Sequence, residues 1–137
     1  ISILLIKNPT GAKAVLRTVT AESPPFDIWL ALNDKTADGH DVSWIWDVDF
    51  EALVGKARKI TCSGTRAQEM ALRLAYAGVE RSRLAVNPAI EDSFDLAVAD
   101  SVRSAVPIFA LPTYTALLEL RTAIAKRGEA PSFWSDT

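Results

Sequence analysis

The chain has 137 residues, of which 49% are hydrophobic and 23% are charged, and its formal net charge is -2 at pH 7. This length and composition are typical of one globular domain with a single apolar core, so we expect residues 1–137 to form one domain. Its Lys and Arg residues are scattered, which disfavours binding to nucleic acid or to an anionic membrane. One cysteine, Cys62, and one histidine, His40, are too few for an internal disulfide or a structural zinc site, so we expect no metal site.

The chain begins in an apolar run, Ile1 to Ile6, without an initiator Met, and we therefore expect it to be cut from a longer protein. This run is too short for the core of a signal peptide. No stretch approaches the length of about 18 apolar residues that a membrane span needs. We therefore expect a soluble, cytoplasmic protein with no membrane span.

Short runs rich in Ile, Leu and Val alternate with segments of helical period, which indicates successive βα units around a mostly parallel sheet. Right-handed crossovers would place helices on both faces of that sheet. The predicted fold is therefore a Rossmann-like three-layer α/β domain with five or six strands. The expected strands are Ile3–Ile6, Phe26–Leu32, Lys59–Cys62, Leu84–Val86 and Val106–Leu111.

Helical periodicity follows four of these strands, and a further short helix is expected from Phe50, with Asp49 as its cap. The first segment is short, around Ala14–Leu16. The second begins after Ser63-Gly64-Thr65 and ends at Gly78. The last begins near Thr113 or Thr115 and ends at Lys126-Arg127-Gly128. The inward-facing residues are expected to be Ala67, Met70, Ala71 and Leu74, then Phe94, Ala97, Val98 and Val102, then Leu117, Leu120 and Ile124.

Polar segments follow the predicted strands at the point where each strand ends. Because parallel strands all end at one edge of the sheet, which we call the carboxyl edge, these segments should lie close together there. Ligands of open parallel sheets bind at this edge. The segments are Asn8-Pro9-Thr10-Gly11, the loop Asn33–Ser43, Ser63-Gly64-Thr65-Arg66 and Pro112-Thr113-Tyr114-Thr115.

The segment Ser63-Gly64-Thr65-Arg66 has two interpretations. Its backbone N–H groups, hydroxyls and guanidinium at the start of a helix suit a phosphate group. The same residues also suit a helix cap with a glycine where strand and helix approach closely, and we favour this second interpretation because most such junctions bind nothing. The chain has no Walker motif or dinucleotide fingerprint, so an independent nucleotide site is not expected.

The loop from Ala37 to Trp44 brings two aspartates, the single histidine and a tryptophan into eight positions. One hypothesis makes Cys62 a nucleophile with His40 as its base, but an apolar strand favours an inert thiol at Cys62. A plain turn at Asp38-Gly39 is the simpler interpretation. Solvated carboxylates are expected at Asp41, Asp47 and Asp49, and packing roles at Trp29, Trp44, Trp46 and Trp134.

Several ordered segments resemble the C-terminal domain of the MurT family, which is related to the third domain of the Mur ligases. The most specific match is Asp38-Gly39-His40-Asp41-Val42-Ser43-Trp44. The resemblance covers nearly the whole chain and agrees with the α/β fold predicted above. Its segments are Ile6–Gly11, Ala37–Glu51, Ser63–Ala67 and Leu111–Thr115.

The resemblance implies a function in lipid II amidation during peptidoglycan biosynthesis. In this family the MurT subunit uses ATP and Mg²⁺ to activate the D-glutamate carboxylate of lipid II, and the GatD glutaminase releases ammonia from glutamine, so that D-isoglutamine forms. The ATP-binding domain of the family lies upstream of the matching region. We therefore expect no cofactor and no activity in this chain alone, and a complex that acts at the inner face of the cell membrane.

The resemblance also implies roles for particular residues. Asp41 matches the aspartate that MurT is proposed to donate to the glutaminase triad of GatD. Neighbouring residues would shape this loop or contact the partner: Asp38, Gly39, His40, Ser43 and Trp44. By analogy with Mur ligases, a possible substrate or nucleotide rim comprises Asn8, Thr10, Ser63, Thr65 and Arg66.

Two other functions stay open at this point. The chain could belong to an amino-acid-adding Mur-type ligase without a glutaminase partner. It could also be a non-catalytic interaction module in which the loop from Asp38 to Trp44 only docks. Asn87-Pro88 matches no family role, and a turn explains it.

Overall fold

A computed structural model describes residues 1–128 and 135–136 of the chain. Its six strands form one sheet in the order β4-β3-β2-β5-β1-β6, and every neighbouring pair is parallel. The predicted parallel α/β fold is therefore confirmed. The strands are β1 (Ser2–Ile3), β2 (Phe26–Ala31), β3 (Ala57–Ser63), β4 (Leu84–Val86), β5 (Ile108–Pro112) and β6 (Ser135–Asp136).

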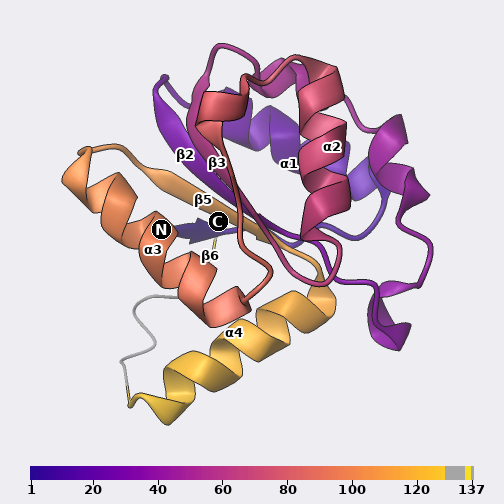
Figure 1. The fold of residues 1–137 in the computed structure, drawn as a ribbon, viewed down its shortest axis with the longest axis vertical. Helices are drawn as coiled ribbons and strands as arrows, with labels where there is room; N and C mark the ends of the chain where they lie inside the picture. The colour runs from indigo at the N-terminus through magenta and orange to yellow at the C-terminus, as the bar shows by residue number, and fades with distance from the viewer. Residues whose placement is uncertain (129–134, 137) are drawn as a thin grey trace.

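Two pairs of helices cover the two faces of this sheet (Figure 1). One apolar cluster joins the first two helices to the sheet, and a second cluster joins the last two to the opposite face. All six residues of the central strand β2 are buried, as expected for a strand covered on both sides. The helices are α1 (Pro9–Thr20), α2 (Ala67–Ala77), α3 (Ile90–Arg103) and α4 (Tyr114–Lys126). Among the described residues, none of the helices has the length and apolar character needed to cross a membrane.

The first helix begins earlier than predicted and is longer. It starts at Pro9, spans 12 residues, and makes Pro9-Thr10-Gly11 its first turn instead of a loop. The cause is Asn8, whose Oδ1 accepts the N–H of Gly11 at 2.8 Å and so caps the helix. Proline at the first helical position has the required backbone angle and lacks an N–H that would otherwise go unbonded.

Two further expectations were wrong. Val102 is 74% exposed, because the inward position near the end of α3 belongs to Ser101 one residue earlier. The hydroxyl of Ser101 donates to the carbonyl of Val98 at 2.8 Å, which lets a polar residue occupy that buried place. Asp49 precedes a 3-10 helix, η3 (Phe50–Leu53), but its side chain makes no cap hydrogen bond there.

The crossover from β2 to β3 contains three 3-10 helices and no α-helix: η1 (Thr36–Asp38), η2 (Ser43–Asp47) and η3. Buried Arg73 on α2 holds this crossover in place. Its guanidinium donates to the carbonyls of Ile45 at 3.0 Å and Val48 at 2.6 Å, and to the carboxylate of Glu51 at 2.9 Å. The segment after the carboxyl end of β2 is therefore fixed against α2.

The tryptophans differ in their surroundings. Trp29 is fully buried and stacks edge-on against Phe94, and Trp44 is half-buried against the core, which confirms the packing role predicted for both. Trp46 is 43% exposed and does not fit that prediction. Trp134 lies outside the described residues.

Candidate functional site

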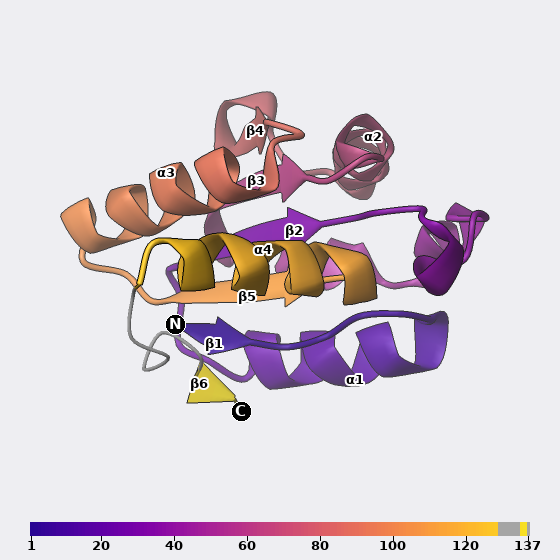
Figure 2. The ribbon, with the colours of Figure 1, turned by 90° about the horizontal axis from the view of Figure 1, so that it is seen from below.

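The carboxyl ends of the strands point to one edge of the molecule, where the crossover with η1 and η2 also lies (Figure 2). The loop after β2 meets the segments after β3 and β5 at this edge through hydrogen bonds of Asn33, Thr65 and Thr113. The structure thus brings together three of the four polar segments that the sequence predicted at the carboxyl edge.

Asn33 is the central residue of this edge and is fully buried. Its Oδ1 accepts the N–H of Thr65 at 3.0 Å, and its Nδ2 donates to the hydroxyl of Thr115 at 2.9 Å. Its backbone N–H donates to the hydroxyl of Thr113 at 3.0 Å. One amide side chain therefore fixes the starts of α2 and α4 relative to β2. Asn33 was not among the predicted site residues, although its place directly after a buried strand is a signal that could have found it.

Asp38 and His40 hold the exposed part of the loop. Asp38 accepts the N–H of Thr115 at 2.9 Å and also its hydroxyl, which ties the loop to the first turn of α4. It accepts the N–H of Lys35 at 3.1 Å as well. Nδ1 of His40 lies 2.8 Å from the carbonyl oxygen of Asp34 and so carries the proton that this contact requires. Gly39, with φ of 87°, makes the turn between them.

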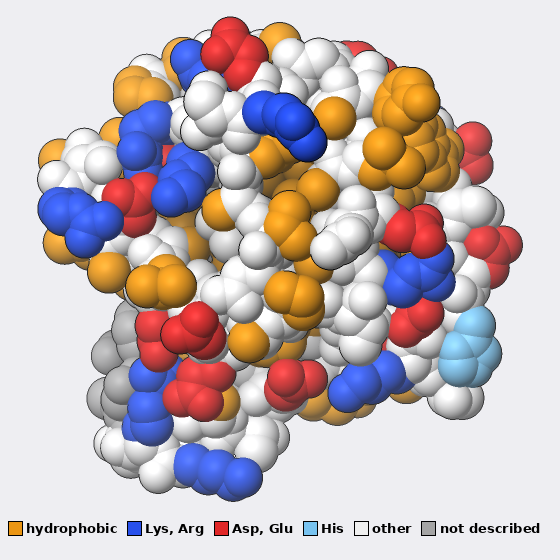
Figure 3. Space-filling view, viewed as in Figure 1, with side chains coloured by type: hydrophobic (Ala, Val, Ile, Leu, Met, Phe, Trp, Pro, Cys, Tyr) orange, Lys and Arg blue, Asp and Glu red, His pale blue; other side chains and the backbone are white. Residues whose placement is uncertain are grey.

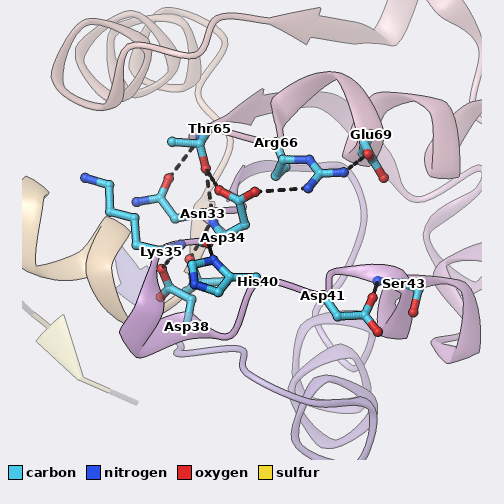
Figure 4. Close-up of polar contacts among 11 residues, drawn as sticks. Asn33, Asp34, Lys35, Asp38, His40, Asp41, Ser43, Thr65, Arg66 and Glu69 are labelled. Carbon is cyan, nitrogen blue, oxygen red and sulfur yellow. Dashed lines mark hydrogen bonds and ion pairs between the residues drawn. The ribbon is translucent and has the colours of Figure 1, made fainter.

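Asp41 is exposed near the end of this loop, beside Ser43. It lies apart from the hydrogen-bonded residues around Asn33 and Asp38 (Figure 4). Its Oδ1 accepts the backbone N–H of Ser43 at 2.9 Å. This bond and a second one from the Ser43 side chain lower the pKa of Asp41, and the positive charge of Arg66 adds to the effect. Asp41 is therefore an ionised carboxylate with a fixed direction, at the surface of the carboxyl edge.

The turn Ser63-Gly64-Thr65-Arg66 is bonded within the fold. The N–H groups of residues 64 to 67 donate to the oxygens of Pro88, Asn33, Leu32 and Gly64 respectively. The guanidinium of Arg66 bonds Asp34 at 3.0 Å and also Glu69, and Arg66 is the main cause of the lowered pKa of Asp34. These contacts support a helix-start junction and leave little here for a phosphate.

Gly64 shows why this junction needs a glycine. Its φ is 90°, and a Cβ there would lie 2.5 Å from the carbonyl oxygen of Leu32. Leu32 is buried directly after β2 and its oxygen accepts the N–H of Arg66, so it has no room to move and any larger residue is excluded. This agrees with the predicted role of the glycine at a close approach of strand and helix.

The other predicted site residues lie in different surroundings. Asn8 is exposed but caps α1, and Thr10 is exposed in the first turn of that helix. Ser63 is fully buried and accepts the hydroxyl of Ser93 at 2.8 Å, so it is not part of a surface rim. Thr65 is exposed, and its hydroxyl bonds Asp34 at 2.8 Å.

Cys62 is fully buried in β3, and burial raises its pKa to about 12. His40 lies in the exposed loop and is turned toward the carbonyl of Asp34. This rules out the hypothesis of a Cys62 nucleophile with His40 as its base. Within residues 1–128 and 135–136, no three His, Cys, Asp or Glu side chains are grouped so that they could hold a metal ion.

Comparison with known proteins decides the family. A family model described as MurT ligase C-terminal matches residues 5–117. The chain belongs to the MurT ligase C-terminal family. The subunit MurT of the glutamine-hydrolyzing lipid II isoglutaminyl synthase from Streptococcus pneumoniae is similar to it, with 34% identity over 92% of this chain and 28% of that protein. The subunit of the same name from Staphylococcus aureus strain COL is 38% identical over 84% of this chain and 25% of that protein.

The region that MurT relatives share with this chain is a small part of them, since the chain spans about a quarter of their length. A solved structure of the folylpolyglutamate synthase from Mycobacterium tuberculosis, in complexes with ADP and AMPPCP, has a TM-score of 0.54. It is 18% identical and covers 93% of this chain and 29% of that protein. This likeness shows that the chain shares the fold of the matched part of that synthase.

Proposed function

We propose that residues 1–137 form the C-terminal domain of the MurT subunit of a lipid II isoglutaminyl synthase, and that this domain gives Asp41 to the glutaminase site of GatD. The observation that carries the proposal is the placement of Asp41. Its carboxylate is exposed at the carboxyl edge and is aimed by Ser43, while its neighbours in the loop are bonded inward. Another polypeptide can therefore reach it without unfolding any part of this one.

The chemistry of a glutaminase uses such a carboxylate. A cysteine of GatD would attack the amide carbon of glutamine after a histidine of GatD takes the thiol proton. Asp41 would accept the N–H of that imidazole, fix its tautomer and stabilise the imidazolium that forms. The lowered pKa of Asp41 supports this role, because the carboxylate must be charged when the histidine gains its proton.

The ammonia released would then amidate the D-glutamate carboxylate of lipid II, activated with ATP, at the inner face of the cell membrane. We assign the binding of ATP and Mg²⁺ to other parts of the full-length enzyme. The turn after β3 does not fit a nucleotide phosphate, because its N–H groups and Arg66 are bonded within the fold. Asn8, Thr10 and Thr65 are the predicted rim residues that stay exposed, and the hydroxyl of Thr65 is bonded to Asp34.

The test is Asp41→Asn in the full-length subunit, reconstituted with GatD. The amide keeps the shape of the side chain but loses the charge, so glutamine hydrolysis at saturating GatD should fall by a factor of about 10² to 10⁴. The affinity between the subunits should stay close to wild type. Glu22→Gln is the matched control, because it removes one exposed carboxylate in the turn after α1, remote in the chain from the loop, and should leave turnover unchanged.

Other outcomes would favour the other functions. Unchanged hydrolysis in Asp41→Asn would remove Asp41 from the mechanism, and binding of GatD without any effect on its turnover would indicate a docking module. Ligation of a free amino acid by the full-length protein, with no response to glutamine, would indicate an amino-acid-adding ligase.

A further inference from the structure

Three large apolar side chains are exposed beside the Asp41 loop, on η2 and α2. Trp46 is 43% exposed, Leu72 is 52% exposed and Tyr76 is 73% exposed. The rings of Trp46 and Tyr76 meet edge-on with centroids 5.5 Å apart, and Leu72 lies one helical turn before Tyr76 on α2. We call these three residues the aromatic patch. Figure 3 shows hydrophobic side chains gathered over this part of the molecule, with acidic side chains beside them.

Arg73 holds the Trp46 ring of the aromatic patch in place. The guanidinium of Arg73 lies 5.4 Å from the centre of the Trp46 ring, and Arg73 is itself fixed by the carbonyls of Ile45 and Val48. Exposed Trp and Tyr side chains that are already ordered lose little entropy when a partner covers them. Such residues carry most of the binding energy in protein interfaces.

The position and charge of the aromatic patch indicate what covers it. Trp46 follows Asp41 by five residues and lies in η2, the 3-10 helix that begins at Ser43. The segment from Asp41 to Glu51 contains four carboxylates and no Lys or Arg. Arg73 pairs with one of the four, Glu51. A partner surface that is complementary to the aromatic patch and these carboxylates is therefore apolar at its centre and basic around it.

We propose that the aromatic patch is the docking surface for the glutamine-hydrolysing subunit, through an apolar surface of that subunit ringed by Lys and Arg. This inference rests on the proposed function, because a polypeptide whose histidine reaches Asp41 must cover the adjoining surface as well. In this arrangement the aromatic patch supplies affinity and Asp41 supplies chemistry. The two roles are separable by experiment.

The test compares Trp46→Ala, Tyr76→Ala and Tyr76→Lys in the full-length subunit, with GatD as the binding partner, by titration calorimetry. Each alanine variant should raise the Kd by about tenfold or more, and Tyr76→Lys should raise it further by repelling the basic ring. Turnover at saturating GatD should stay at the wild-type value in all three. Val102→Ala on α3 is the control, since it removes an equally exposed apolar side chain from a helix on the opposite face of the sheet.

Tyr76 is mostly exposed, so its variants should keep the fold, and circular dichroism checks this. An unchanged Kd in folded Tyr76→Ala and Tyr76→Lys overturns the docking proposal, even when Asp41→Asn abolishes turnover and so supports the proposed function. A raised Kd with undiminished turnover in Asp41→Asn keeps the docking surface and refutes the catalytic role. Self-association that Tyr76→Lys abolishes, with affinity for GatD intact, would assign the aromatic patch to a second copy of this chain and overturn the proposal.

Discussion

The two edges of the sheet use polar residues in different ways. At the amino edge, where the strands begin, Arg58 bonds the carboxylates of Asp27 at 2.6 and 2.9 Å and of Asp100 at 2.8 Å. At the carboxyl edge, Asn33 and Asp38 are bonded mainly by threonine hydroxyls and backbone N–H groups. At the first edge a guanidinium neutralises the buried carboxylate of Asp27, whereas at the second edge neutral donors hold Asn33 and Asp38, and the ion pairs of Arg66 with Asp34 and Glu69 are only part-buried.

This difference explains why the carboxyl edge can present a reactive group. A carboxylate paired with a guanidinium, like Asp27, has its charge already compensated inside the fold. Asp41 accepts its hydrogen bonds from Ser43, which is uncharged, so its negative charge remains available to an outside partner. The amino edge should therefore control stability, and the carboxyl edge should control the placement of Asp41.

The largest stability effect should come from Arg58→Met. Asp27 is 3% exposed, so loss of its partner leaves a buried carboxylate uncompensated at a cost of about 3–5 kcal/mol in the free energy of unfolding. Urea denaturation of the chain measures this cost. Glutamine turnover per folded complex should not change, because Arg58 lies at the edge opposite Asp41.

Arg103→Met is the matched control for that substitution. Arg103 also bonds Asp100, at 2.8 Å, but its side chain is 71% exposed, and such surface pairs contribute less than about 1 kcal/mol. Equal losses of unfolding free energy in Arg58→Met and Arg103→Met would show that the buried pair of Arg58 and Asp27 contributes no more to stability than an exposed ion pair does.

A smaller loss of stability, with a specific loss of activity, should follow Asp38→Ala. The substitution removes the acceptor of the Thr115 N–H and hydroxyl and of the Lys35 N–H, which should cost about 1–3 kcal/mol. Because Asp38 ties the Asp41 loop to α4, turnover with GatD should fall by more than the folded fraction does. Asp38→Asn keeps one acceptor oxygen and should recover part of that turnover. A fall in turnover that only follows the folded fraction would mean that Asp38 does not position Asp41.

The smallest effect should be a pH dependence from Asp100. Its hydrogen bonds from Arg58 and then Arg103 lower its pKa from 3.8 to about 2. A lowered pKa means that the ionised form stabilises the fold, fully above pH 3.8, and that this contribution is lost as the pH falls toward 2. The unfolding free energies of wild type and Asp100→Asn should therefore approach one another over this range. Leu96→Ala, an exposed and uncharged change, should differ from wild type by the same amount at each pH, and a constant difference for Asp100→Asn would contradict the prediction.

The order of β1 to β5 and of the helices could be predicted from the sequence, because each of these strands falls in an apolar run between other segments, whereas β6 (Ser135–Asp136) is a polar pair without such a signal. The boundaries depend on local contacts that composition does not show. Asn8-Pro9 carried the signal for the start of α1, since Asn caps helices and Pro suits the first helical position. The prediction relied on apolar periodicity alone, which placed the start of the helix later in the chain. Val102 was misplaced because one residue rotates a helix by about 100°.

The candidate site was only partly predictable. The loop and Asp41 were found by motif, and the threonines near it by their place after a strand. Arg73 could not be found, because its partners are carbonyls in 3-10 turns that form only when the crossover packs against α2. The exposure of Trp46 follows from the same contacts, so the aromatic patch required the structure.

The burial of Cys62 has a practical consequence for work on the complex. Burial raises the pKa of this thiol to about 12, so it stays protonated at neutral pH, and the sheet also shields it from reagents. Since this chain has no other cysteine, alkylating probes added to it together with a glutaminase label the glutaminase alone. The rate of that labelling is therefore a further test of the role proposed for Asp41, because Asp41→Asn should slow it.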